Sequence, residues 1–250
     1  MKAPTLILFL AACGGGGGGM MGDDSADPMV DASTPEPVKD APPTNVPAMV
    51  TIKGKTTERG LSGTTNVAQV TIGVYKVTDE ATAIATTTSD ASGNFTLSVP
   101  TGGAPIDGYV KATKASYLDL YLYPPSAWIA DDMDAGINMM TPGNRDLLNS
   151  FASGNQMPTK GMVGIAVFDA AGMPVTGATF TSAPAAGATK YMGGSGLPDA
   201  NATMTSAEGV GFLFNTEETV LVSANKSGMT FHAHTIKARP GTFTTTSIAP

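Results

Sequence analysis

The sequence has very little cysteine, histidine, tryptophan and charge. Its single cysteine, Cys13, excludes a disulfide within the chain and a zinc site built from several cysteines. Charged residues make up only 14% of the chain, the net charge is −7, and no cluster of lysine and arginine occurs, so a nucleic-acid partner is disfavoured. No apolar run approaches the roughly 20 residues that a membrane-spanning helix needs.

Patterns typical of common hydrolases are also missing. The sequence has no G-x-S-x-G nucleophile elbow and no H-E-x-x-H zinc motif. Its two histidines, His232 and His234, would share one face if they lie in a strand, which is an arrangement that can grip a metal ion. Two solvent-facing histidines are the alternative. We therefore expect no enzyme and no cofactor, with a metal-dependent hydrolase using His232 and His234 as the alternative function.

The first residues have the layout of an export signal. Lys2 gives a positive start, residues 3–12 are apolar, and Leu10-Ala11-Ala12 precede Cys13. This pattern resembles the lipobox of bacterial lipoproteins. The resemblance implies that 1–12 is a signal peptide, that Cys13 carries a diacylglyceryl group, and that the protein is held at a membrane by this lipid. Because Gly14 stands where an acidic residue would resemble an inner-membrane retention signal, we expect a cell-envelope location at the outer membrane.

Residues 13–47 consist largely of glycine, proline, aspartate and serine, without periodicity. Such a segment cannot bury enough apolar surface to offset the entropy of ordering, so it is predicted to be a disordered stalk.

After the stalk the sequence changes to short runs with alternating apolar residues, which predict β-strands. The expected strands are 49–53, 70–77, 95–99, 109–113, 162–168, 175–180, 210–214 and 219–224. The turn-forming cluster 89–94 predicts a hairpin between the second and third of them. The fold class is therefore all-β, composed of antiparallel β-sandwiches of transthyretin-like or immunoglobulin-like type.

Two parts of the chain align with each other. The segment SDASGNFTLSV corresponds to TSAEGVGFLF, and YVKATKASY corresponds to LVSANKSGM. This repeat favours two tandem sandwich domains, 48–125 and 160–250, joined by a linker, 126–159. A single larger sandwich is the alternative.

The residues from the predicted strand 162–168 onwards carry a more specific resemblance. The pattern Gly164-x-x-Val167-x-Asp169-x-x-Gly172-x-Pro174 looks like the opening of the carboxypeptidase regulatory-like domain, a transthyretin-like sandwich. The first half matches the later part of that pattern, from Asp90 onwards. This domain is an accessory module of some peptidases, so the resemblance implies a fold and no catalytic function.

The predicted linker contains one helix signal. Thr141 is a suitable N-cap, Pro142 suits the first helical position, and Leu147, Leu148 and Phe151 would form an apolar face. We expect this helix to pack against the sandwiches. Trp128 is expected to take part in that packing, with ligand stacking as the alternative.

These features predict a non-enzymatic, lipid-anchored protein of the cell envelope that acts as a binding or scaffolding module. Its partner would be a glycan, a peptide strand or another envelope protein. Tyr117, Tyr121 and Tyr123 share one face of a predicted strand and are the candidate aromatic platform for a glycan, together with Trp128; packing in the sheet is the alternative role. A purely structural surface spacer is the remaining alternative.

Overall fold

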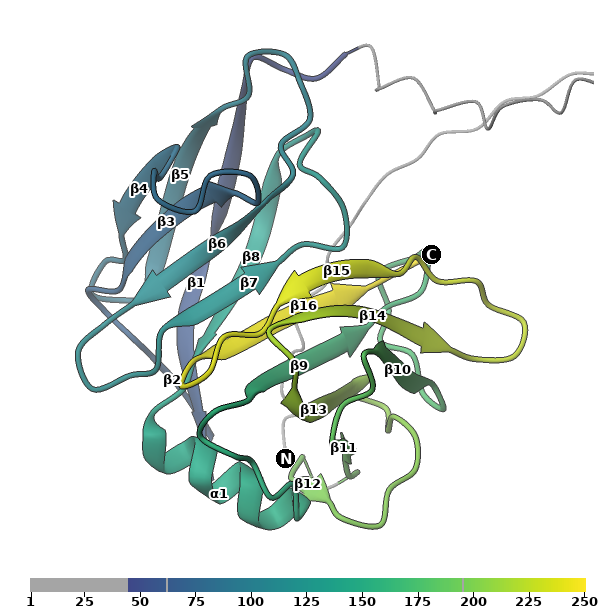
Figure 1. Ribbon diagram of the computed structural model, residues 1–250. Coiled ribbons are helices and arrows are strands. Elements are labelled where there is room, and N and C mark those ends of the chain that lie inside the picture. The colour runs from purple at the N-terminus through teal and green to yellow at the C-terminus, as the bar shows by residue number, and fades with distance from the viewer. Residues whose placement is uncertain (1–44, 62, 195) are drawn as a thin grey trace, which may run out of the picture.

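The computed structural model describes residues 45–61, 63–194 and 196–250. Within these residues the protein is built mostly from β-strands, with one short α-helix (Figure 1). The predicted signal peptide, Cys13 and nearly all of the predicted stalk lie outside the described residues.

A four-stranded sheet is built around one long strand, β1. It consists of β1 (Met49–Gly60), β2 (Gly63–Asn66), β5 (Asn94–Pro100) and β8 (Asp132–Met139). Strand β1 pairs antiparallel with β2 and β5, and parallel with β8. The backbones of β1 and β8 approach closely at Gly54, where an added Cβ atom would lie 1.8 Å from the carbonyl oxygen of Ala135. Only glycine fits this position.

The other strands form a three-stranded and a nine-stranded sheet. The small sheet has the order β10-β14-β15, and the large one has the order β12-β11-β13-β9-β16-β7-β6-β3-β4. The bounds are β3 (Thr71–Lys76), β4 (Ala85–Thr88), β6 (Gly108–Thr113), β7 (Leu120–Tyr123), β9 (Gly161–Val167), β10 (Thr179–Ala183), β11 (Ala188–Met192), β12 (Pro198–Asp199), β13 (Val210–Thr216), β14 (Thr219–Asn225), β15 (His234–Lys237) and β16 (Phe243–Ile248).

The two halves of the chain repeat one strand order. In the first half, β5-β1-β8 forms one sheet and β3-β6-β7 belongs to the other; in the second half, β13-β9-β16 and β10-β14-β15 take the same places. Each half also contains the same parallel pair: β8 is parallel to β1 in the first half, and β16 is parallel to β9 in the second half. The strand order therefore carries the internal repeat that the sequence indicates.

The halves are joined differently from the expected helical linker. The C-terminal strand β16 pairs parallel with both β9 and β7, so one continuous sheet runs through both halves (Figure 1). The predicted linker 126–159 also contains β8, which belongs to the four-stranded sheet. Apolar and polar residues do not alternate regularly along the sequence Asp-Met-Asp-Ala-Gly-Ile of β8. The pairing of β1 with β8 shifts its register between Ile52 and Gly54.

The nine-stranded sheet buries apolar side chains on both faces. On one face, β3, β6 and β7 pack against the four-stranded sheet through residues such as Ile72, Val110 and Leu120. On the opposite face, β9 and β16 pack against the three-stranded sheet through residues such as Ile165 and Ile248. The two flanking sheets thus cover different parts of opposite faces, and the outer face of β3, β4 and the adjoining part of β6 is left open.

The helix α1 (Pro142–Ala152) begins as predicted. Thr141 is the N-cap, and its hydroxyl accepts a hydrogen bond of 3.3 Å from the backbone N–H of Asn144. The expected apolar face is partly wrong, because Leu147 and Phe151 are 41% and 42% exposed, whereas Ala152 is fully buried. No described helix is long and apolar enough to cross a membrane.

Seven of the eight predicted strands are present, whereas at 175–180 only Thr179 and Phe180 belong to a strand, β10. The expected hairpin at 89–94 is wrong. The turn itself forms, since the Asp90 carboxylate accepts hydrogen bonds of 2.8 Å from the N–H groups of Ser92 and Asn94, and Gly93 has φ +80°. However, it leads from β4 in the nine-stranded sheet to β5 in the four-stranded sheet. The turn therefore connects the two layers of the first half.

Candidate functional site

The structure brings two of the three predicted platform tyrosines together. Tyr121 and Tyr123 lie on one face of β7, where they are 8% and 4% exposed and pack in the core of the second half. Tyr117 precedes β7 and packs against the core of the first half, and its hydroxyl donates a 2.9 Å hydrogen bond to Glu58. Because strand alternation begins only at Leu120, the expected common face does not extend to Tyr117.

Trp128 is buried, with 6% exposure, in the core of the first half. Its backbone exchanges two hydrogen bonds with Ile106, of 3.0 and 3.1 Å. Burial raises the pKa of the neighbouring Asp132 carboxyl. Trp128 is thus a packed core residue, and it does not lie with Tyr121 and Tyr123, which belong to the core of the second half.

The two histidines lie in different environments. His232 precedes β15 and is exposed, whereas His234 is half-buried, with its Nε2 atom 2.6 Å from the hydroxyl of Thr246. The hydroxyl of Thr246 also lies 3.0 Å from the carbonyl oxygen of Tyr123, so it links His234 to β7. Burial lowers the pKa of His234. In the described part of the chain, no group of three or more histidine, cysteine and acidic side chains is arranged to hold a metal ion.

Tyrosines from the first half meet one arginine from the second half. The ring centroid of Tyr109 lies 5.2 Å from that of Tyr123 and 5.7 Å from that of Tyr121. The guanidinium of Arg239, which follows β15, lies 4.1 Å from the centroid of Tyr121 and 5.4 Å from that of Tyr109. It also donates a 3.3 Å hydrogen bond to the hydroxyl of Tyr123. We call this group, with Glu80 and Lys237, the junction cluster.

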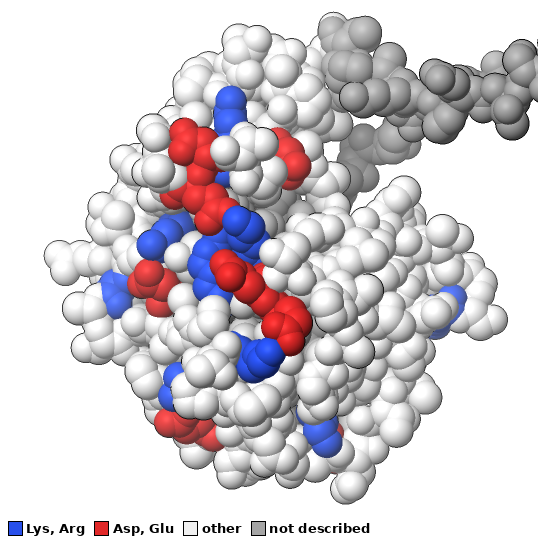
Figure 2. Space-filling view, in the orientation of Figure 1, with Lys and Arg blue, Asp and Glu red and all other residues white. Residues whose placement is uncertain are grey.

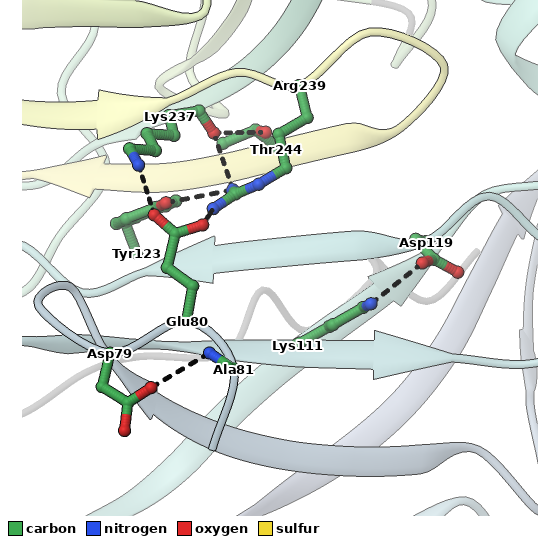
Figure 3. Close-up of polar contacts among 9 residues, drawn as sticks. All are labelled: Asp79, Glu80, Ala81, Lys111, Asp119, Tyr123, Lys237, Arg239 and Thr244. Atoms are coloured by element: carbon green, nitrogen blue, oxygen red, sulfur yellow. Dashed lines mark hydrogen bonds and ion pairs between the residues drawn. The ribbon is translucent and has the colours of Figure 1, made fainter. Parts of the chain in front are cut away.

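Glu80 completes the junction cluster from the loop between β3 and β4 (Figure 3). Its carboxylate accepts from Nζ of Lys237 and forms a 2.6 Å ion pair with Arg239. The hydrogen bond from Lys237 lowers the pKa of Glu80, and burial raises the pKa of Tyr109 to about 12. A cation held between aromatic rings and a carboxylate is strongly oriented. The cluster therefore fastens the two halves where β7 meets β16.

A shallow polar depression lies beside the junction cluster on the open face of β3 and β6. It has a volume of about 580 Å³ and is lined by Gln69, Thr71, Thr113, Lys114, Ala115 and Asp119. At its edge Lys111 forms a 3.2 Å ion pair with Asp119 (Figure 3). Figure 2 shows charged side chains gathered over this region, while the neighbouring surface toward β14 carries few charges. This surface is the candidate site.

Sequence reasoning missed most of these residues. One signal was available, because Tyr109, Lys111 and Thr113 alternate along a single strand and therefore share a face. No local pattern indicates that Gln69 or Asp119 would lie beside them, or that Glu80 and Arg239 would meet across the chain.

Comparison with known proteins gives only remote similarities. No family model matches the chain, and a search of curated proteins finds no match. Among solved structures, the shaft pilin SpaA from Lactobacillus rhamnosus GG is 14% identical, with 81% of this chain and 97% of the pilin covered and a TM-score of 0.26. The minor pilin GBS52 of Streptococcus agalactiae is 11% identical, with coverages of 80% and 94% and a TM-score of 0.27.

The Bacillus anthracis TIE protein is 12% identical at a TM-score of 0.25, and the match covers 80% of this chain but only 34% of that protein. This chain therefore spans about a third of it. All these TM-scores lie below 0.5 and carry no argument about fold or function. The resemblance to the carboxypeptidase regulatory-like domain stays a prediction.

Proposed function

We propose that the protein is a non-enzymatic, lipid-anchored component of the cell envelope that presents a rigid β-body as a binding module. The observation that carries the proposal is the open polar face beside the junction cluster. Strand β16 and the junction cluster fasten both halves into one body, and Thr71 and Thr113 of this face lie on paired strands of its large sheet. A rigid strand scaffold is what a precise binding surface requires.

The anchor is proposed from the sequence around Cys13. The pattern Leu10-Ala11-Ala12-Cys13 follows a positively charged start and an apolar segment. Two or three acyl chains hold a protein stably at a membrane, whereas one chain holds it only marginally. The glycine-rich residues after Cys13 would give the body reach above the lipid surface. Gly14 supports the outer membrane as the location in a two-membrane cell.

The alternatives receive less support from the geometry. A hydrolase centred on His232 and His234 needs both imidazoles beside an acid in one pocket, and one of them is exposed while the other is bonded to Thr246. A purely structural spacer needs no polar depression on an open sheet face. Ligand binding at that depression would therefore distinguish a binding module from a spacer.

The anchor is tested by membrane fractionation and by the mass of the mature N-terminus in a Gram-negative host. We expect the wild-type chain to start at acylated Cys13 and to fractionate with the outer membrane. Cys13→Ser should abolish acylation and leave the protein unprocessed or soluble. Gly14→Asp serves as a matched variant, because it should keep the acyl group and move the protein to the inner membrane. An unacylated wild-type chain in the soluble fraction would overturn the proposal.

A further inference from the structure

Two of the six residues that line the polar depression, Thr71 and Thr113, occupy strand positions that point away from the first core, and the other four lie in the adjoining loops. Residues Thr71 and Thr113 are paired in the β3–β6 register, and Thr88 of β4 pairs with Thr71 on the other side. These threonines therefore form one row across three strands. The next row contains Gly73, Lys111 and Tyr121, which are paired in the same way. Hydroxyl groups and a lysine–tyrosine contact thus lie side by side on a regular sheet.

Backbone strain is concentrated at the rim of this depression. Gln69, which lines it, has φ +54°, and Ser116, which follows the lining residue Ala115, has φ +71°. Residues with a side chain rarely adopt this left-handed region, and glutamine is not among the residues that favour it. The surrounding chain holds the segment at Gln69, because the N–H of Gln69 donates to the carbonyl of Ser89 and Lys114 donates to the carbonyl of the preceding residue, Ala68. Strain held in this way is typical of residues placed for a function.

The lining side chains have unused hydrogen-bonding capacity. Within the described residues, the amide of Gln69 and the hydroxyls of Thr71 and Thr113 have no hydrogen-bond partner. Two hydroxyls and one amide supply both donors and acceptors at one place. They can bond a ligand without first breaking a bond inside the protein, which favours binding.

The charges of the site indicate which ligands fit. Lys111 is paired with Asp119 at 3.2 Å, and Glu80 satisfies both Lys237 and Arg239. Lys114, the lysine that lines the depression, donates to a backbone carbonyl. A polyanion would therefore have to displace carboxylates that are already bound to the cations. A neutral ligand rich in hydroxyl groups can form hydrogen bonds with the hydroxyl, amide and charged groups of the depression. It does so without displacing the carboxylates from the cations.

We propose that the polar depression of Gln69, Thr71, Thr113 and Asp119 binds a neutral oligosaccharide. The aliphatic stem of Lys114 and the methyl group of Ala115 cover the apolar face of a sugar ring, while the polar groups bond its hydroxyls. This inference rests on the proposed binding function and names its ligand class.

The experiment uses the full chain, fluorescently labelled, on an array of neutral oligosaccharides that includes the maltose, cellulose, chitin and mannan series. Polygalacturonate is the anionic probe. We expect binding to at least one neutral series, and a titration with the bound trisaccharide then gives its Kd. Thr113→Val preserves shape and removes the hydroxyl, and Gln69→Gly removes the amide and relieves the positive φ. Each should raise the Kd about fivefold, as expected for the loss of one hydrogen bond.

Matched controls are Thr181→Val and Thr235→Val, which remove exposed hydroxyls from β10 and β15 and should leave the Kd unchanged. Thermal unfolding confirms that every variant is folded. The proposal is overturned by the absence of binding to every neutral series, by binding of polygalacturonate alone, or by a Kd that the depression variants do not change. None of these results affects the anchor at Cys13, which fractionation tests separately.

Discussion

Replacing Arg239 with methionine tests whether the junction cluster holds the halves together. Methionine keeps an unbranched apolar stem over Tyr121 and removes the charge. The side chain of Arg239 is 16% exposed, and its guanidinium contacts two aromatic rings, the carboxylate of Glu80 and the hydroxyl of Tyr123. The substitution therefore removes several interactions from a largely buried position.

The expected loss follows from these contacts. A partly buried cation–π contact contributes about 0.5–2 kcal/mol, and a hydrogen bond to a charged group contributes about 1.5–3 kcal/mol. Because the side chain of Glu80 is 34% exposed, its ion pair is screened by solvent and adds at most about 1 kcal/mol. The contributions overlap, so Arg239→Met should lower the free energy of unfolding by about 2–4 kcal/mol.

Urea unfolding followed by two probes measures this loss. Fluorescence of Trp128 reports on the first half, and far-ultraviolet circular dichroism reports on both halves. The control is Lys160→Met, which removes an exposed ion pair with Glu217 and should cost less than about 1 kcal/mol. A double-mutant cycle with Glu80→Gln should give a coupling energy near 1 kcal/mol. If Arg239→Met costs no more than Lys160→Met, the junction cluster does not stabilise the fold.

Three further substitutions have predicted effects on the stability of the fold. Gly54→Ala should lower the unfolding free energy by at least about 1–3 kcal/mol, because its Cβ atom would meet the backbone of Ala135; an unchanged urea midpoint would contradict this close approach. Burial lowers the pKa of His234, so its contribution to stability is present above the unfolded-state pKa near 6.5 and is lost as pH falls toward its folded-state pKa. The melting temperature should therefore decrease less on acidification in His234→Gln than in wild type, whereas exposed His232→Gln should behave like wild type. The pKa of Tyr109 is raised to about 12, so stability present below pH ~10 is lost as pH rises from 10 toward 12, and melting curves of Tyr109→Phe should lack this component.

The local features of the fold follow from short-range sequence patterns. Alternating apolar residues identify β3, β5, β6 and β13, and turn residues such as Asp90 and Gly93 mark where strands end. Thr141 and Pro142 locate the start of α1, because capping depends on neighbours only a few residues away. The repeated segments also indicate the strand order shared by the two halves.

The pairing of distant strands depends on information that no local pattern contains. Strand β16 inserts between β7 and β9, which are formed by residues far from it in the sequence, and the turn at 89–94 crosses between sheets instead of closing a hairpin. Parallel pairing gives no turn signal, because its partners are joined by long connections. Only the tertiary structure therefore shows that both halves share one sheet.

Some features of the candidate site follow from the sequence, whereas others are visible only in the tertiary structure. The sequence by itself determined that Tyr121 and Tyr123 share a strand face and that the chain is poor in charge. Only the tertiary structure decided that these tyrosines are buried under Arg239, that Glu80 reaches across to it, and that the open surface lies instead at Gln69, Thr71 and Thr113. The physical reason is that alternation fixes which side chains share a face, whereas the packing of other sheets decides which part of that face is covered.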